Sequence, residues 1–459
     1  MYTVNFEKPM HVHFIGIGGI SMSGLAEILL DEGFRVSGSD ARESALTRRL
    51  ESLGARVFYG QRAENIQPGT ELVVYTAAIH PDNPEFAAAA ARGLPMLTRA
   101  ELLGQIMKNY RMPIAVAGTH GKTTTTSMAS EILLEARRDP TISVGGILPS
   151  IGGNIRVGGS ETFITEACEY TNSFLSFCPR IGIILNMDAD HLDFFKDIED
   201  IRHSFRKFAE LLPADGALII DRDTPAWEEV ARGLPCRVIT YSLREEADYT
   251  ARDISFDREG HPSFTALRHG KTMGQFSLRV PGKHNISNAL ASIALADLLE
   301  IDPDTIQRGF QRFHGADRRF QYKGTFQGVA VIDDYAHHPT EIRATLTAAE
   351  NYPHKTLWCV FQPHTYTRTK ALFSQFAQAL SLADRVILAD IYAARETDTL
   401  GVSSADLAAA VSALGTECLY LPSFEAIEDF LKKNCSPGDL LITMGAGDVV
   451  NIGENLIQK

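Results

Sequence analysis

Short apolar segments alternate with helical patterns along most of the chain. In the first third, an apolar segment that begins at His11 precedes a helical pattern over 22–30, and residues 35–39 are typical of a second strand. A further strand is predicted over 71–76 and a further helix over 84–91. Strands that alternate with helices in this way favour a parallel, doubly wound sheet.

The middle of the chain repeats this alternation. Residues 111–113 are interpreted as a linker between a helix over 99–108 and a buried strand over 114–117. Residues 215–280 show no clear periodicity and are interpreted as a more irregular stretch. The other elements predicted in this part are a helix from 122 to 134, strands over 162–167 and 181–186, and an alanine-rich helix over 286–300.

The last third again combines strands and helices, predicted as strands over 329–332, 356–361, 385–389 and 440–443, with helices that begin near 340 and 369. A chain of 459 residues is long enough for about three domains. The predicted fold is therefore α/β with three domains, at 1–108, 109–315 and 316–459. The first and last are expected to be Rossmann-like, and the central one is expected to carry a phosphate loop on a mixed or parallel sheet.

Charge and composition exclude several classes of protein. With 44 basic and 57 acidic residues the net charge is −13, and no segment is basic, so nucleic acid is not an expected partner. The six cysteines are scattered without a CxxC pair, which argues against a zinc site or a disulfide framework. No apolar run approaches the roughly 18 residues that span a bilayer. We expect a cytoplasmic protein that does not insert stably into membranes.

The strongest local motif lies between the strand at 114–117 and the following helix. Glycines let backbone N–H groups surround phosphate oxygens at the positive end of a helix, where Lys122 can reach the β and γ phosphates and the Thr123 hydroxyl can bind Mg²⁺. Val116 stands where the general pattern has a glycine, so this loop is a shortened variant. The motif comprises Gly118, Thr119, His120, Gly121, Lys122, Thr123 and Thr124.

Carboxylates follow the next two predicted strands. Glu166 and Glu169 lie at the end of the first, and one of them is expected to face the phosphate loop as a metal ligand. The stretch 188–193 holds three aspartates and His191. This spacing is equally compatible with a metal site and with an acidic helix cap.

A glycine turn near the N-terminus is a second candidate for phosphate binding. Gly16, Gly18 and Gly19 resemble a dinucleotide fingerprint, although Ser21 replaces its third glycine, and Asp40 ends the second strand where a ribose-binding acid would lie. The turn could serve a nicotinamide-dependent oxidoreductase, could hold the diphosphate of a nucleotide sugar, or could bind no ligand.

Two polar loops follow strands of the last third. Residues 333–340 contain an Asp-Tyr-His cluster, and residues 362–368 contain His364 and Arg368. Neighbouring strands of a doubly wound sheet would bring both loops to one edge, which favours a functional role over two unrelated structural loops.

Together these motifs resemble the Mur ligase family, the ATP-dependent amide-forming enzymes of peptidoglycan synthesis. The resemblance covers essentially the whole chain and includes residues 118–124, Glu166, the His284-Asn-Ile-Ser-Asn288 motif and 318–320. Residues 13–26, 188–193, 333–341 and 366–369 are most similar to the members that attach L-alanine to UDP-N-acetylmuramate. Such a reaction would form an acyl phosphate from the lactyl carboxylate and ATP, which the amine of L-alanine would then attack.

The resemblance also implies roles for individual residues. Lys122 and Arg319 would hold the γ-phosphate, and Thr123, Glu166 and His191 would bind Mg²⁺. Asn288 would bind adenine, Asp334 the ATP ribose, and the Gly16–Gly19 turn with Asp40 the UDP moiety. The side from which L-alanine enters would be lined by Tyr335, His337, His364 and Arg368, with Arg368 as the partner of its carboxylate. The residues expected to be catalytic are Lys122, Glu166, His191, His337 and Arg368.

One position departs from the family pattern, because Thr365 replaces the first arginine of His-Arg-Tyr-Thr-Arg. Arg368 then binds the carboxylate alone, or amino-acid selectivity differs. The alternatives are a ligase that attaches a preformed tripeptide to UDP-N-acetylmuramate, the oxidoreductase above, and a nucleotide-binding regulator without catalysis. The family resemblance further implies closure of a mobile third domain over ATP, and we expect a monomer or weak homodimer.

Overall fold

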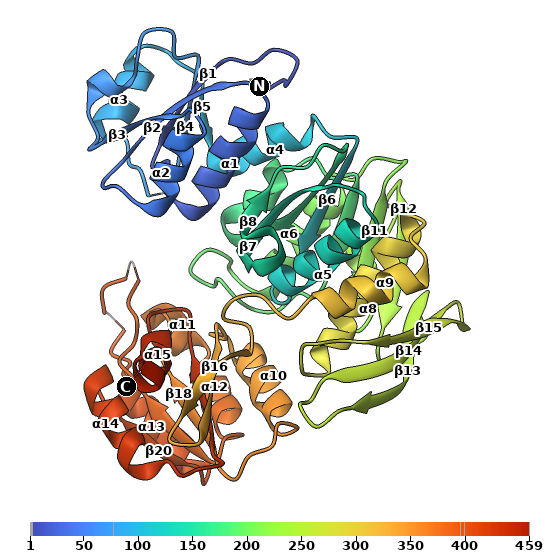
Figure 1. Cartoon of the computed structure of the whole chain (residues 1–459), viewed down its shortest axis with the longest axis vertical. Coiled ribbons are helices and arrows are strands. Elements are labelled where there is room, and N and C mark those ends of the chain that lie inside the picture. The colour runs from blue at the N-terminus through green and yellow to red at the C-terminus, as the bar shows by residue number, and fades with distance from the viewer. Residues whose placement is uncertain (1–2, 77, 395, 399, 459) are drawn as a thin grey trace.

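The computed structural model describes residues 3–76, 78–394, 396–398 and 400–458. Within them, three β-sheets follow one another along the chain, each with its own helices (Figure 1). The predicted α/β class with three sheet-containing regions is confirmed. In the described part of the chain, no helix is both long and apolar enough to cross a membrane.

The first sheet is parallel throughout, with strand order β3-β2-β1-β4-β5. Its strand order reverses between β1 and β4, so a crevice opens at the carboxyl ends of these two strands. The strands are β1 (His11–Ile15), β2 (Arg35–Asp40), β3 (Arg56–Tyr59), β4 (Leu72–Tyr75) and β5 (Met96–Thr98). The helices are α1 (Ile20–Asp31), α2 (Ala45–Ser52), α3 (Pro84–Ala91) and α4 (Arg99–Met107), with a 3₁₀ turn at Ala63–Asn65.

The central sheet has ten strands in the order β15-β14-β13-β12-β11-β10-β6-β9-β7-β8. Its middle is parallel, whereas β8 and the β13–β15 hairpins pair in antiparallel fashion. The strands are β6 (Met112–Ala117), β7 (Thr141–Leu148), β8 (Gly153–Arg156), β9 (Thr162–Ala167), β10 (Ile181–Ile184), β11 (Ala217–Asp221), β12 (Arg237–Ser242), β13 (Tyr249–Phe256), β14 (Pro262–Arg268) and β15 (Lys271–Ser277). The helices are α5 (Lys122–Glu135), α6 (Ile198–Ala209), α7 (Trp227–Ala231), α8 (His284–Leu298) and α9 (Pro303–Arg312), with 3₁₀ turns at Pro149–Ile151 and Tyr170–Ser176.

Two expectations about this part were wrong. Residues 215–280 are not irregular but carry β11 to β15. Strands β13 and β15 are largely exposed or half-buried and lack a strong apolar period, whereas β11 and β14 are mostly buried. Residues 111–113 are not a linker, because Met112 and Pro113 already belong to β6. Proline is tolerated there because it lies at the start of the strand.

The third sheet is parallel except at its edge, with the order β16-β17-β21-β18-β19-β20 and β16 antiparallel. The helix expected from 369 begins three residues earlier and is divided into α11 and α12. The strands are β16 (Gln321–Phe326), β17 (Val329–Asp334), β18 (Leu357–Phe361), β19 (Arg385–Leu388), β20 (Glu417–Tyr420) and β21 (Leu440–Met444). The helices are α10 (Pro339–Ala349), α11 (Tyr366–Ala371), α12 (Phe373–Leu380), α13 (Ser404–Ala413), α14 (Phe424–Asn434) and α15 (Val450–Gln458).

Close packing joins the first region to the central sheet. A Cβ atom at Gly24 of α1 would lie 2.1 Å from a side-chain carbon of Ile155 on β8, so only glycine allows this helix to approach the strand. One apolar cluster runs through both regions and includes Met22, Phe163 and Phe205. The first region is therefore held against the central sheet by buried apolar surface.

Candidate active site

The phosphate loop connects β6 to α5 at the centre of the middle sheet. Gly118 and Gly121 have φ angles of +146° and +82°, which disfavour any residue with a side chain. A Cβ atom at Gly121 would lie 2.6 Å from the side-chain oxygen of Asn288, so the loop backbone closely approaches α8. The N-terminus of α5 thus presents backbone N–H groups to an open cleft, as phosphate binding requires.

Lys122 folds back over this loop. Its ammonium lies 2.9 Å from Glu169 Oε2 and donates to the carbonyls of Gly118 and Thr119. Burial opposes the charged form, but the adjacent Glu169 carboxylate raises the pKa of Lys122 above its usual value. The lysine is therefore a fixed positive charge beside the loop.

Both acids at the end of β9 face the loop, whereas the sequence predicted only one. The Thr123 hydroxyl donates to Glu166 Oε2 at 3.1 Å, and the other oxygen of Glu166 accepts from the Gly145 N–H. Glu169 pairs with Lys122 instead. Glu166 and Thr123 therefore place two oxygen atoms that could bind a metal side by side, whereas Glu169 orients Lys122.

The three aspartates of 188–193 do not converge on one point. Asp188 approaches His120 at 3.1 Å, Asp190 pairs with Arg368 at 3.0 Å, and Asp193 accepts from the Tyr170 hydroxyl at 2.7 Å. His191, with a φ of +53°, stacks on the Tyr170 ring and lies 3.8 Å from Glu169 Oε1. The stretch therefore distributes its three carboxylates among three different partners.

Glu341 is the centre of a polar network that sequence reasoning did not single out. Its carboxylate lies 3.3 Å from His120 Nδ1, 3.3 Å from His337 Nδ1 and 3.8 Å from Arg319 Nη1. Although burial opposes ionisation, the neighbouring His337, His120 and Arg319 side chains hold the pKa of Glu341 well below its usual range. The available signal was its place three residues after the N-cap His338, where a capping-box acid is expected.

Arg319 and Asp334 meet beside this network. The Asp334 carboxylate accepts the N–H groups of Phe320 and Ala336, each at 2.8 Å, while burial raises its pKa to about 6. The guanidinium groups of Arg318 and Arg319 lie 4.9 and 5.5 Å from the centre of the Tyr335 ring. Arg318 is held by Asp333 at 2.9 Å, so it supports the loop and leaves Arg319 facing the cleft.

One cleft unites these groups between the central and the third sheet. Residues from the phosphate loop, Asn288, Arg319 and Asp334 all line it, together with residues for which the sequence predicted no role. The latter include Asn186, Asp221, Ser287, Phe313 and Glu341. Asp221 ends β11, and this position at the carboxyl edge of a parallel strand could have indicated it.

A second cleft lies between the 188–193 stretch and α11. It is lined by His191, His364 and Arg368, and also by Glu396, which accepts the Thr367 N–H at 2.9 Å. His364 Nδ1 lies 3.1 Å from Arg368 Nη1, and its ring is 6.0 Å from that of His337. His337, His364 and Arg368, three of the residues predicted for the amino-acid side, therefore lie close together. No sequence signal distinguished Glu396.

The glycine turn of the first region is closed by its own aspartate. The Gly18 N–H donates to Asp40 Oδ2 at 2.8 Å, and the Ala41 N–H donates to Oδ1 at 2.8 Å. Asp40 thus shapes the turn that begins α1. Beneath it, the fully buried His13 and Glu85 side chains approach to 3.2 Å.

The class of protein is defined by family models that match the three α/β regions in turn. These models match residues 11–111 (Mur ligase family, catalytic domain), 116–296 (Mur ligase middle domain) and 318–447 (Mur ligase, glutamate ligase domain). The chain belongs to the Mur ligase family.

Relatives within the family are similar over the full chain. The UDP-N-acetylmuramate–L-alanine ligases of Agathobacter rectalis and Lachnospira eligens are 63% and 61% identical to it, with complete coverage of both chains in each comparison. Among solved structures, the UDP-N-acetylmuramate-alanine ligase MurC of Thermotoga maritima superposes with a TM-score of 0.80 at 30% identity, covering 98% of each chain. The murein peptide ligase mpl of Psychrobacter arcticus gives 0.70 at 26% identity, also with 98% of each chain covered.

Proposed function

We propose that this protein joins L-alanine to the lactyl carboxylate of UDP-N-acetylmuramate, with ATP converted to ADP and phosphate, as a step of peptidoglycan synthesis. The observation that carries the proposal is the 63% identity over all 459 residues to the Agathobacter rectalis ligase. The two clefts support it, because one has the groups for a nucleoside triphosphate and the other has a buried arginine for a carboxylate.

In the first step, the lactyl carboxylate attacks the γ-phosphate and forms an acyl phosphate while ADP leaves. The loop N–H groups, Lys122 and Arg319 would stabilise the charge that builds on the phosphate oxygens. Lys122 is suited to this role because Glu169 keeps it charged and positioned. Asn288 and Asp334 would bind the adenine and the ribose from opposite sides of the cleft.

The residues present fit a Mg²⁺ ion at the loop. Thr123 and Glu166 already place a hydroxyl and a carboxylate oxygen 3.1 Å apart, and hard oxygen donors are the ligands that Mg²⁺ prefers. His191 would approach from the neighbouring stretch, beside Glu169. When bound, Mg²⁺ would neutralise negative charge on the phosphate groups of ATP.

In the second step, the amine of L-alanine attacks the acyl phosphate and releases inorganic phosphate. Arg368 would bind the amino-acid carboxylate, because a guanidinium can make a bidentate pair. Burial lowers the pKa of His364 to about 4 and also lowers that of His337, so both rings are neutral near pH 7. Tyr335 would complete this side, and a neutral imidazole here can accept the proton that the attacking amine loses.

The remaining assignments are parts of the same proposal. The crevice at Gly16, Gly18 and Gly19 would receive the UDP moiety, with Asp40 holding the turn in shape. Residues 1–108, 109–315 and 316–459 would act as three domains whose closure excludes water from the acyl phosphate. A cytoplasmic location and a monomeric or weakly dimeric state remain predictions.

The test supplies the purified protein with ATP, Mg²⁺ and UDP-N-acetylmuramate and adds either L-alanine or the tripeptide. We expect phosphate release with L-alanine and the matching UDP-linked product in a mass spectrum. Release with the tripeptide alone would assign the recycling reaction, which the fold similarity to the Psychrobacter arcticus enzyme keeps as the second candidate. A control without UDP-N-acetylmuramate measures uncoupled ATP hydrolysis.

A further inference from the structure

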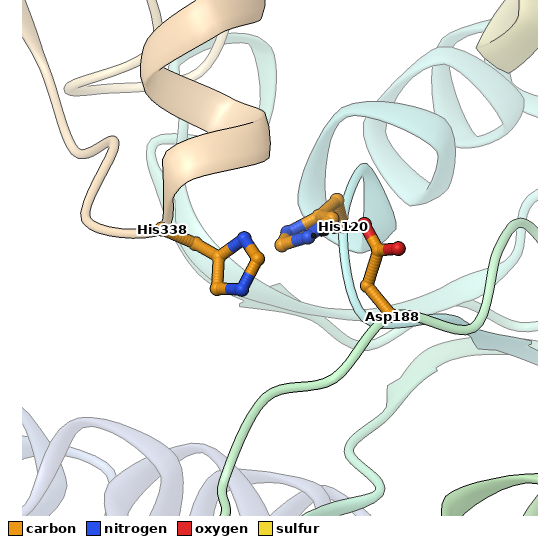
Figure 2. A group of neighbouring side chains, drawn as sticks. All are labelled: His120, Asp188 and His338. Carbon is orange, nitrogen blue, oxygen red and sulfur yellow. Dashed lines mark ion pairs between the residues drawn. The ribbon is translucent and has the colours of Figure 1, made fainter. Parts of the chain in front are cut away.

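Three metal-ligating side chains meet where the third region touches the phosphate loop. His120 comes from the loop, Asp188 from the segment after β10, and His338 from the N-terminus of α10 (Figure 2). One ligand atom of each lies within 4.8 Å of the others, and the two imidazole centres are 4.7 Å apart. The proposed reaction uses His120 only as part of the loop and gives Asp188 and His338 no role.

We propose that His120, Asp188 and His338 form a binding site for a transition-metal dication such as Zn²⁺, which links the central region to the third. This site shares no residue with the Mg²⁺ ligands Thr123, Glu166 and His191. Metal binding at His120, Asp188 and His338 does not depend on the proposed reaction.

The type of ligand selects the type of metal. Two imidazole nitrogens and one carboxylate oxygen are the set found in three-ligand zinc sites, which keep a fourth position for water or another ligand. With two imidazoles among its three ligands, the site favours a transition metal over Mg²⁺, which prefers oxygen ligands. The fourth position would face the nucleotide cleft, because His120 and Asp188 both line it.

The two histidines differ in protonation near pH 7. His338 is 3% exposed, and burial together with the neighbouring His120 lowers its pKa to about 4, so the ring is neutral at pH 7 and has a lone pair to offer. His120 lies between Asp188 at 3.1 Å and Glu341 at 3.3 Å. Although burial opposes its charge, these carboxylates raise the pKa of His120 to about 9, so a metal ion would displace a proton there.

His120 also lacks well-formed hydrogen bonds. Both of its ring nitrogens are buried, and among the described residues neither has a partner with hydrogen-bond geometry despite the two nearby carboxylates. The two carboxylates compensate its charge, but their angles leave the ring nitrogens without well-formed hydrogen bonds. A Zn²⁺ ion would give one of these nitrogens a partner.

The site needs only local adjustment to close around an ion. Zinc bonds of about 2.0–2.1 Å in tetrahedral geometry place ligand atoms roughly 3.4 Å apart. His120 and Asp188 already approach to 3.1 Å, and the widest separation in the group, at most 4.8 Å, would have to shrink by up to about 1.4 Å. His338 would exchange one of its present weak contacts, with the Ala189 carbonyl or the Thr340 N–H at 3.3 Å each, for the metal. Because the ligands come from two regions, the ion would hold the central and the third region together.

The experiment titrates the chelator-treated, nucleotide-free full chain with Zn²⁺ by calorimetry and with Co²⁺ by visible absorption. We expect one tight site per chain and the intense absorption of four-coordinate Co²⁺. The variant His338→Asn keeps an acceptor at the N-cap of α10 but removes the imidazole ligand. It should weaken Zn²⁺ binding at least tenfold, because losing even a residue that supports a metal ligand indirectly typically weakens metal affinity by about that factor. His203→Asn, at an exposed histidine on α6, is the matched control and should bind as the unmodified chain does.

Asp188→Asn provides a second test if His338→Asn is unstable, and it should lose the site as well. Glu166→Gln should leave the site intact, because Glu166 belongs to the predicted Mg²⁺ site. Unchanged Zn²⁺ affinity in both His338→Asn and Asp188→Asn, or a six-coordinate Co²⁺ spectrum, would overturn the proposal. If the ligase reaction is confirmed, Zn²⁺ should inhibit it under excess Mg²⁺ in the unmodified chain but not in His338→Asn.

Discussion

Arg368 of α11 and Asp190 of the central region form an ion pair of 3.0 Å although 178 residues separate them in the sequence. Both side chains are largely buried, at 10% and 6% exposure. The pair fixes Arg368 through its Nε atom, and His364 contacts Nη1. The guanidinium is thereby oriented in the cleft before any amino acid binds.

This orientation predicts that lysine cannot replace Arg368. Arg368→Lys keeps the charge but loses the planar fork that can hold Asp190 and a substrate carboxylate together. We expect the KM for L-alanine to rise by about 10- to 100-fold, the equivalent of roughly 1.4–3 kcal/mol for a charge-assisted contact, with little change in the KM for ATP. Steady-state kinetics with each substrate varied in turn measures both, and an equal rise in the two constants would contradict a local role.

The ion pair of Lys122 and Glu169 makes a prediction that separates catalysis from folding. Lys122→Met should lose nearly all turnover, but it also leaves the 2%-exposed Glu169 without its partner, which should cost on the order of 3 kcal/mol of stability. The double variant Lys122→Met/Glu169→Gln removes that buried charge. It should recover thermal stability while phosphate release stays absent; recovery of activity would refute the role of the lysine.

The buried carboxylate of Glu85 predicts a structural requirement in the first region. It accepts from Ser39 at 2.7 Å and Asn65 at 2.6 Å and lies 3.2 Å from His13 Nε2, and the side chains of Glu85 and His13 are fully buried. Glu85→Ala should lower the free energy of unfolding by about 3–5 kcal/mol, since it leaves these partners buried and unsatisfied. Chemical denaturation measures this change.

The matched control for Glu85 is Glu43→Ala. Glu43 is 54% exposed and pairs with the exposed Arg48, so its loss should change the unfolding free energy by less than about 0.5 kcal/mol. Equal effects of the two substitutions would show that the buried network contributes nothing specific.

Asp221 predicts a pH dependence of stability. Burial raises its pKa from 3.8 to about 6, so the folded chain binds an extra proton at this site between about pH 4 and 6. The contribution of Asp221 to the free energy of unfolding therefore falls as the pH rises through that window and stays low at higher pH. Asp221→Asn should raise the melting temperature at pH 8 and change it little at pH 4.5.

Thermal scans of the unmodified chain and Asp221→Asn at several pH values measure the effect as a difference, which cancels the other titrating groups. Asparagine retains one acceptor for the Ser287 hydroxyl, now 3.1 Å from Asp221 Oδ2. A melting difference that did not vary between pH 4.5 and 8 would contradict the raised pKa.

Local patterns in the sequence were sufficient for most of the parallel strands and for the phosphate loop. Strand β9 and helix α3 have the predicted bounds, because short apolar runs and a proline at a helix start are signals carried by the residues themselves. The loop at 118–124 was likewise evident, since its glycines, lysine and hydroxyl must be adjacent in sequence to surround a phosphate. The family resemblance depended on these local motifs and is confirmed.

The tertiary structure decided which distant residues meet. Strands β13 to β15 form mainly through pairing with one another, so their exposed residues carried no strong period. The aspartates of 188–193 separate because Arg368 and Thr340 of the third region attract two of them. Glu341 gains its central position only when α10 lies against the phosphate loop. Ion pairs form only when two charged groups come within a few ångströms, so they depend on how the chain folds. Adjacency in the sequence determines only the local motifs.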